Sequence, residues 1–70
     1  MITKKDMKLA KTIKKYRKIA DLTQQELGDK VGVTQKYIQY LESANRTPSL
    51  KVLRKIAQSL NIKSSDLNLL

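Results

Sequence analysis

The sequence predicts an all-α domain of five short helices, and three observations support this prediction. Apolar residues recur at steps of three and four along most of the chain, which is the period of an amphipathic helix. No segment of useful length alternates like a β-strand. The chain has 70 residues, and a domain near this size buries only about 60% of the surface that its unfolded chain exposes. One small core is therefore expected.

The first helix is expected over residues 7–20, with lysines on the side opposite its apolar stripe. That stripe consists of Leu9, Ile13, Tyr16 and Ala20. The second helix is expected from Gln24 to about Gly32, because the stretch from Thr23 to Glu26 fits a capping box. Residues 1–6 are then expected to form a basic N-terminal tail, and residues 7–70 the folded domain.

The third helix is expected from about Gln35 to Glu42, where Thr34 caps its start and a polar stretch leading to Pro48 ends it. The fourth helix begins after a cap at Thr47 or Ser49, and the sequence leaves both open. Its apolar stripe consists of Leu50, Leu53, Ile56, Ala57 and Leu60. The fifth is a short turn that starts at Ser64-Ser65-Asp66 and packs Leu67 and Leu70.

The composition excludes several kinds of chemistry. There are 15 Lys and Arg against 6 Asp and Glu, a net charge of +9, and neither Cys nor His. Disulfides, thiolate nucleophiles and the usual zinc ligands are absent, so we expect no enzyme, no metal and no cofactor. No apolar run resembles a membrane span or a signal peptide, which indicates a cytoplasmic protein. The strong positive charge favours a polyanionic partner.

Two oppositely charged residues fall on faces that are otherwise apolar. Arg17 shares the stripe of the first helix, and Glu42 lies on the inward face of the third helix with Ile38. Burying either charge alone would cost several kcal/mol. We therefore expect Arg17 and Glu42 to form a structural ion pair that holds the third helix.

The second and third helices are short and nearly contiguous, so they must cross steeply, which is helix-turn-helix geometry. Gly32 falls where a helix end often needs a left-handed backbone. Gly28 offers a small face at which the third helix can approach closely. An ordinary loop glycine and a weakly helical glycine could also stand at these positions. The residues around them are therefore needed to identify a helix-turn-helix.

From about Ile13 to Leu67 the sequence resembles the phage-repressor and Cro type of helix-turn-helix DNA-binding domain, also called the XRE family. The motif stands here as Arg17, Leu22-Thr23-Gln24-Gln25-Glu26-Leu27-Gly28, Val31-Gly32-Val33-Thr34, Ile38, Leu41-Glu42, Pro48-Ser49-Leu50, Leu53, Ile56-Ala57 and Leu60. The family usually has Ala where Gly28 stands and Gly where Ala44 stands. The resemblance implies a compact five-helix, lambda-repressor-like domain that binds DNA, and it also implies that Arg17 and Glu42 pair.

The third helix supplies the residues expected to read bases. On a helical wheel Lys36 and Tyr40 lie opposite the core-facing side, Gln39 flanks them, and Gln35 occupies the first turn, which enters the major groove. Gln suits adenine and Lys suits guanine, so the half-site should contain both. In the resembled family Gln35, Lys36 and Gln39 match positions that commonly touch bases. The alternative is that these are solvated residues of a surface helix.

Phosphate contacts are expected elsewhere. Gln24 lies at the start of the second helix, where free amides favour an anion, and its family counterpart grips a phosphate. Tyr37, Asn45 and Arg46 are expected to join it. Tyr37 and Tyr40 could instead shield the edge of the core.

The predicted function is therefore a sequence-specific, double-stranded DNA-binding transcriptional regulator, a repressor that binds an inverted-repeat operator as a homodimer. Leu67, Leu69 and Leu70 would form the dimer surface or close the monomer core. The alternative is an antitoxin or a restriction-modification controller that also binds a protein partner. A third hypothesis places residues 4–19 on an anionic membrane, which we do not favour.

Overall fold

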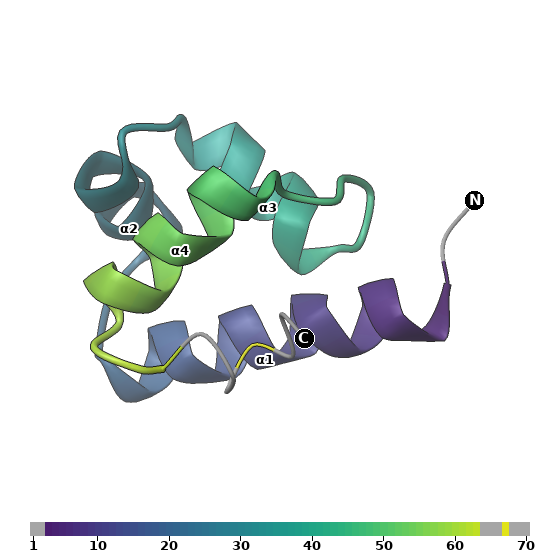
Figure 1. Cartoon of the computed structure of the whole chain (residues 1–70). Helices are drawn as coiled ribbons and strands as arrows, with labels where there is room; N and C mark the ends of the chain where they lie inside the picture. The colour runs from purple at the N-terminus through teal and green to yellow at the C-terminus, as the bar shows by residue number, and fades with distance from the viewer. Residues whose placement is uncertain (1–2, 64–66, 68–70) are drawn as a thin grey trace.

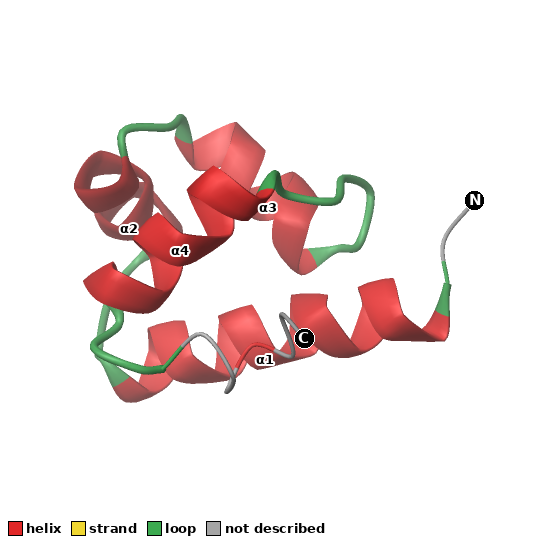
Figure 2. Cartoon of the chain, in the orientation of Figure 1, coloured by secondary structure: helices red, strands yellow, loops and turns green. Residues whose placement is uncertain are grey.

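The computed structural model describes residues 3–63 and Leu67. α1 (Lys4–Ile19) runs along one side of the molecule, and three shorter helices lie together on the other side, α2 (Gln24–Val31), α3 (Gln35–Glu42) and α4 (Leu50–Ser59) (Figure 1). The described residues form no strand (Figure 2). α2 contacts both α3 and α4, and α1 contacts α3. The all-helical prediction is confirmed.

The prediction of five helices is wrong, because the described residues contain four. Most of the fifth expected helix, residues 64–66 and 68–70 with Leu69 and Leu70, lies outside the described residues. Leu67 is described: it is in a 3₁₀ conformation and fully buried. Leu67 therefore closes the monomer core, which was one of its two expected roles.

One core joins all four helices. Its centre is formed by residues with almost no exposed surface, namely Ile13, Leu27, Ile38, Leu41, Ile56 and Leu67. Val31, Leu53, Ala57 and Leu60 extend the same cluster. The apolar stripes expected for the helices therefore face one another, except at Ala20 and Leu50, which are exposed.

Each helix begins with a hydroxyl side chain that accepts a backbone amide: Thr3, Thr23, Thr34 and Ser49. Ser49 rather than Thr47 thus caps α4. α1 begins at Lys4, earlier than the residue 7 expected, because Thr3 and Asp6 form a capping box. Residues 4–6, which were expected in the tail, thus form the first turn of α1.

The capping boxes of α1 and α2 affect their carboxyl groups. The backbone amide of Thr3 donates to Asp6 and lowers its pKa, and the amide of Thr23 does the same for the pKa of Glu26. A carboxyl group with a lowered pKa in the folded state stabilises the fold at neutral pH. This contribution is lost as the pH falls through the acidic range in which the group gains a proton.

All four helices are followed by a residue with a left-handed backbone: Asp21, Gly32, Ala44 and Asn61, with φ of 59°, 85°, 62° and 55°. After α3, the amide of Ala44 donates to Leu41 O at 3.2 Å and that of Asn45 to Tyr40 O at 2.9 Å, which is a Schellman ending. Ala44 therefore adopts the conformation that glycine takes easily. The chain keeps a tight helix end although it lacks the glycine usual in the family.

Gly28 faces the turn before α3 at very short range. A Cβ atom on Gly28 would lie 2.7 Å from the carbonyl oxygen of Val33 and 3.2 Å from that of Thr34. The expected close approach of the third helix at Gly28 is thus confirmed, and it involves the backbone of the turn itself.

Replacing Gly28 with alanine is therefore expected to destabilise the domain. Overpacking against rigid backbone costs about 1–3 kcal/mol, whereas alanine gains only about 0.5–1 kcal/mol over glycine inside a helix. The net loss should appear as a lower urea midpoint with an unchanged slope. Lys30→Ala, an exposed change in the same helix, serves as the control. A Gly28→Ala variant more stable than wild type would show that the turn moves freely.

Candidate nucleic-acid interface

The turn between α2 and α3 fixes how the two helices cross. The carbonyl oxygen of Gly28 accepts the amides of Gly32 at 2.8 Å and Val33 at 2.9 Å, which closes α2. Three residues then lead into α3, where the Thr34 hydroxyl accepts the amide of Tyr37 at 3.0 Å. The short connection and its two closed ends give the helix-turn-helix arrangement that the sequence predicted.

Arg17 and Glu42 form a two-pronged ion pair between α1 and α3. Arg17 Nε donates to Glu42 Oε2 at 2.6 Å, and Nη2 donates to Oε1 at 3.0 Å. Both side chains are buried, at 10% and 3% exposure. Arg17 Nη1 also donates to the carbonyl oxygen of Leu22 at 2.7 Å. The two residues expected to pair thus lie together, and the same guanidinium also binds the loop before α2.

Gln24 joins this network, a contact that no sequence pattern predicted. Its Nε2 donates to Glu42 Oε1 at 3.2 Å, so one carboxylate connects the start of α2 and the end of α3 to α1. The capping box places Gln24 at the start of α2. The apolar periods of α2 and α3 do not predict its contact with Glu42. The bond orients a side chain that was expected to contact phosphate.

The outer face of α3 carries the residues expected to read bases. Gln35, Lys36, Gln39 and Tyr40 are all exposed, while Ile38 and Leu41 on the core-facing side are buried. The wheel of α3 therefore describes which side chains are available to a partner. We call these four residues the recognition face. None of them belongs to the buried core.

A shallow pocket of about 240 Å³ brings part of this set together. It is lined by Thr34, Lys36, Tyr37, Tyr40 and Arg46. Gln35 and Gln39 do not line it and stand elsewhere on the helix. Two residues expected to read bases and two expected to contact phosphate thus share one hollow at the surface.

The loop after α3 places its polar residues beside the helix. The Arg46 guanidinium lies over the Tyr37 ring, 5.9 Å from its centre, within the range of a cation–π contact. Tyr37 also packs against the core and is partly buried. Asn45 is exposed and its side-chain amide donates to the Ser43 hydroxyl at 2.9 Å. Tyr37 thus shields the core edge and also positions Arg46.

Neither a membrane-spanning helix nor a metal-binding cluster is found among the described residues. No helix among residues 3–63 is long and apolar enough to cross a membrane. No three carboxylate side chains in that part of the chain come together in a way that could hold a metal ion.

Comparison with known proteins agrees with this arrangement. The family model described as "Helix-turn-helix" matches residues 13–67. An uncharacterised HTH-type transcriptional regulator of Archaeoglobus fulgidus is 42% identical over 55 residues, which cover 79% of this chain and 78% of that protein. Another, from Methanocaldococcus jannaschii, is 38% identical over 55 residues, covering 79% and 83%.

Two solved structures have the same fold. The restriction-modification controller protein C.AhdI of Aeromonas hydrophila matches with a TM-score of 0.84 and 26% identity, over 87% of this chain and 92% of that one. The clp gene regulator ClgR of Corynebacterium glutamicum matches with a TM-score of 0.89 over 99% and 73%, and its 19% identity shows the fold alone. The chain therefore belongs to the helix-turn-helix family of DNA-binding transcriptional regulators, of the phage-repressor and Cro type.

Proposed function

We propose that the protein regulates transcription by binding a specific duplex sequence, with α3 in the major groove. The observation that carries the proposal is the exposed polar face of α3 on a helix whose other side is fixed by the core and by the Arg17–Glu42 pair. Base readout needs side chains that are free to reach a groove and a helix that does not move. Gln35, Lys36, Gln39 and Tyr40 meet the first condition.

Gln24, Tyr37, Asn45 and Arg46 would hold the backbone on either side of the groove. Gln24 belongs to the first turn of α2, where unpaired amides and the helix dipole favour a phosphate. Arg46 supplies a positive charge beside the recognition face. Phosphate contacts position a helix but carry no sequence information, so these four residues should affect affinity for all duplexes alike.

We further propose that two copies bind an inverted repeat and repress by occupying it. In this geometry the two recognition helices lie one helical turn apart, about 34 Å. The likeness to a restriction-modification controller protein at 26% identity favours a controller role of that kind as the specific function. An antitoxin role with a protein partner, and a cytoplasmic location, stay predictions. Copurification with a small protein would support the antitoxin role.

Selection of genomic fragments, followed by footprinting of the bound fragment, tests the proposal directly. The expected footprint contains two related half-sites in inverted orientation, with centres about 10 base pairs or a multiple of that apart. Binding that shows no preference among fragments would contradict a sequence-specific regulator. A single protected half-site would keep DNA recognition but contradict the proposed dimer.

Replacing Gln35 or Lys36 with alanine is expected to weaken operator binding by about 1–3 kcal/mol for each base that the side chain reads. Binding to random duplex should change little, because base readout adds affinity only at the right sequence. Fluorescence anisotropy with both duplexes measures the ratio. Gln58→Ala and Lys55→Ala make the same changes on exposed positions of α4 and should leave the ratio intact. Equal ratios in all four variants would overturn these assignments.

A further inference from the structure

The outward face of α1 carries a row of lysines that the proposed DNA contacts do not use. The row consists of Lys4, Lys8, Lys11, Lys15 and Lys18, at alternating steps of four and three residues, and all five are exposed. At about 100° per residue they fall within a sector of about 80°. At about 1.5 Å per residue the row is roughly 21 Å long. We call it the lysine row.

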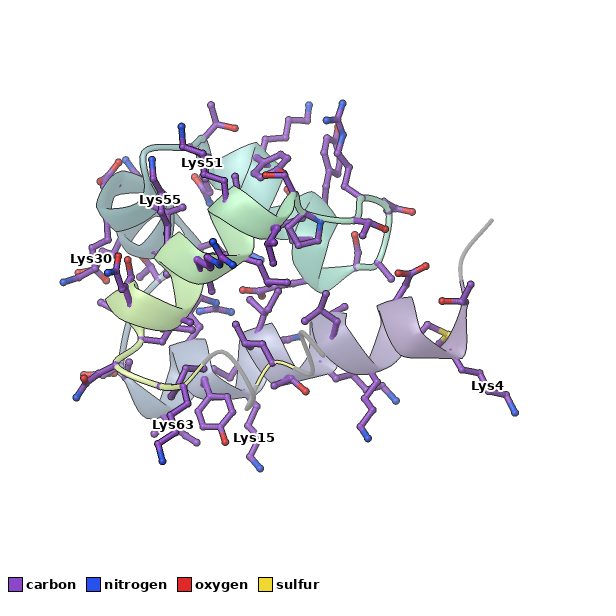
Figure 3. The ribbon with its side chains drawn as sticks, in the orientation of Figure 1. Lys4, Lys15, Lys30, Lys51, Lys55 and Lys63 are labelled. Carbon is purple, nitrogen blue, oxygen red and sulfur yellow. The ribbon has the colours of Figure 1, made fainter. Side chains whose placement is uncertain are left out.

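The lysine row and the recognition face point in opposite directions. Ala10, Ile13 and Arg17 are buried on the side of α1 that faces the other helices, and Arg17 binds α3 through Glu42. Lys36 and Tyr40 of the recognition face lie on the side of α3 away from this contact. Figure 3 shows Lys4 and Lys15 directed away from the rest of the molecule. A straight duplex held by α3 could not also lie along the lysine row.

Within the fold the Lys15 ammonium lies 5.7 Å from the centre of the Tyr16 ring, but no acidic side chain among the described residues pairs with the row. The ion pair found among the described residues is Arg17–Glu42, so none of the five is neutralised by an acidic side chain there. Asp6, the acid within α1, accepts hydrogen bonds from Thr3 and Thr47. Like charges four residues apart repel on a helix. The lysine row therefore disfavours the isolated helix, which points to a partner outside the chain.

We propose that the lysine row is a second DNA-backbone site, so that the domain can hold one duplex on α3 and another on α1. A duplex offers one negative charge per about 1.7 Å of its axis, in a straight array that such a row can follow. A membrane fits less well, because it requires a continuous apolar face. The exposed apolar residues of α1, Met7 and Ile19, lie near its two ends and on opposite flanks of the row.

Bridging of two duplexes rests on the proposed function, because α3 holds the first duplex. Binding of a duplex by the lysine row does not depend on that function. The experiment anchors operator duplex to a surface, saturates it with the full-length chain, washes, and adds a fluorescent random duplex. The row variant is Lys8→Gln/Lys11→Gln/Lys15→Gln. The control, Lys30→Gln/Lys51→Gln/Lys55→Gln, removes the same charge from exposed positions of α2 and α4. Circular dichroism checks that both variants fold.

Wild type and control are expected to capture the second duplex, whereas capture by the row variant falls at least about tenfold. Each phosphate that is no longer neutralised should reduce the dependence of log affinity on log salt by about 0.9. Operator binding should change less than about twofold. Equal capture of the second duplex by the row variant and the control would overturn the proposal. So would a loss of operator affinity in the row variant as large as its loss of capture.

Two further measurements keep the outcomes separate. If no operator exists, the proposed function fails, and direct binding of random duplex to wild type and row variant still tests the lysine row. Vesicles of phosphatidylglycerol are the second probe. Stronger dependence of vesicle binding than of duplex binding on Lys8, Lys11 and Lys15 would overturn DNA as the ligand in favour of a membrane.

Discussion

Glu42→Ala is expected to destabilise the domain by about 3–5 kcal/mol, because removing one partner leaves a buried charge without compensation. Arg17 is 8% exposed and would lose both bonds to the carboxylate. Gln24 would lose its bond to the same group. A domain of this size has about 0.05–0.15 kcal/mol of stability per residue. This one change could therefore remove most of the free energy of unfolding.

Thermal unfolding followed by circular dichroism measures the effect. A loss of about 4–8 °C per kcal/mol is expected for a small domain, so the Tm should fall by at least about 12 °C. Asp29→Ala removes an exposed acid from α2 and should leave the Tm nearly unchanged. The double variant Arg17→Met/Glu42→Leu removes both charges and should recover much of the loss, because apolar replacements for a buried pair are often neutral or stabilising.

A Glu42→Ala variant as stable as wild type would contradict the structural role of the pair. A double variant that is stable but binds operator poorly would add a second conclusion. It would mean that the pair also holds α3 in the orientation that DNA requires. Thermal unfolding and operator binding thus separate the contribution of the pair to stability from its contribution to the orientation of α3.

The sequence predicted the helix-turn-helix closely, because its signals are local. Thr23, Gly32 and Thr34 mark the ends of α2 and the start of α3 through interactions spanning four residues or fewer. The Arg17–Glu42 pair could also be predicted, since a charge on an apolar stripe must find a partner. In both cases the physical requirement was visible in the order of residues.

The parts that were missed depend on three-dimensional packing or on a weak signal. The capping box of Thr3 and Asp6 uses Asp where Glu or Gln is usual, so the start of α1 was placed too late. The bond from Gln24 to Glu42 joins residues 18 positions apart, and neither helix pattern contains it. Leu67 is fully buried with residues of α1, α2, α3 and α4 in one core cluster, and this depends on the space that the other core residues leave.

The positive charge of the chain is distributed unevenly over its surface. Most of the net charge of +9 comes from the first 18 residues, and the exposed lysines of α1 face away from α3. The segment that would read DNA carries only Lys36 and Arg46 against Glu42. If the lysine row binds a second duplex as proposed, affinity for that duplex and choice of operator sequence belong to different faces of the molecule, and variants should alter one without the other.

Ile38→Ala is expected to lower the stability of the domain without changing the preference of α3 for operator DNA. Ile38 is fully buried at the centre of the core, and an Ile→Ala change at such a site costs about 2–5 kcal/mol. Urea unfolding should show this loss, while Ile38→Val should lose only about 0.5–1.5 kcal/mol. The exposed Lys36 side chain lies on the opposite side of the helix from Ile38 and should remain in place.

Binding should then weaken only as far as the folded fraction decreases. Measured at a low temperature at which Ile38→Ala is fully folded, the preference for operator over random duplex should equal that of wild type. Lys36→Ala should give the reverse result, with unchanged unfolding and a reduced preference. If Ile38→Ala lost its preference while fully folded, the core would have to set the position of α3 on DNA within narrow limits. The recognition face would then depend on packing as well as on its exposed side chains.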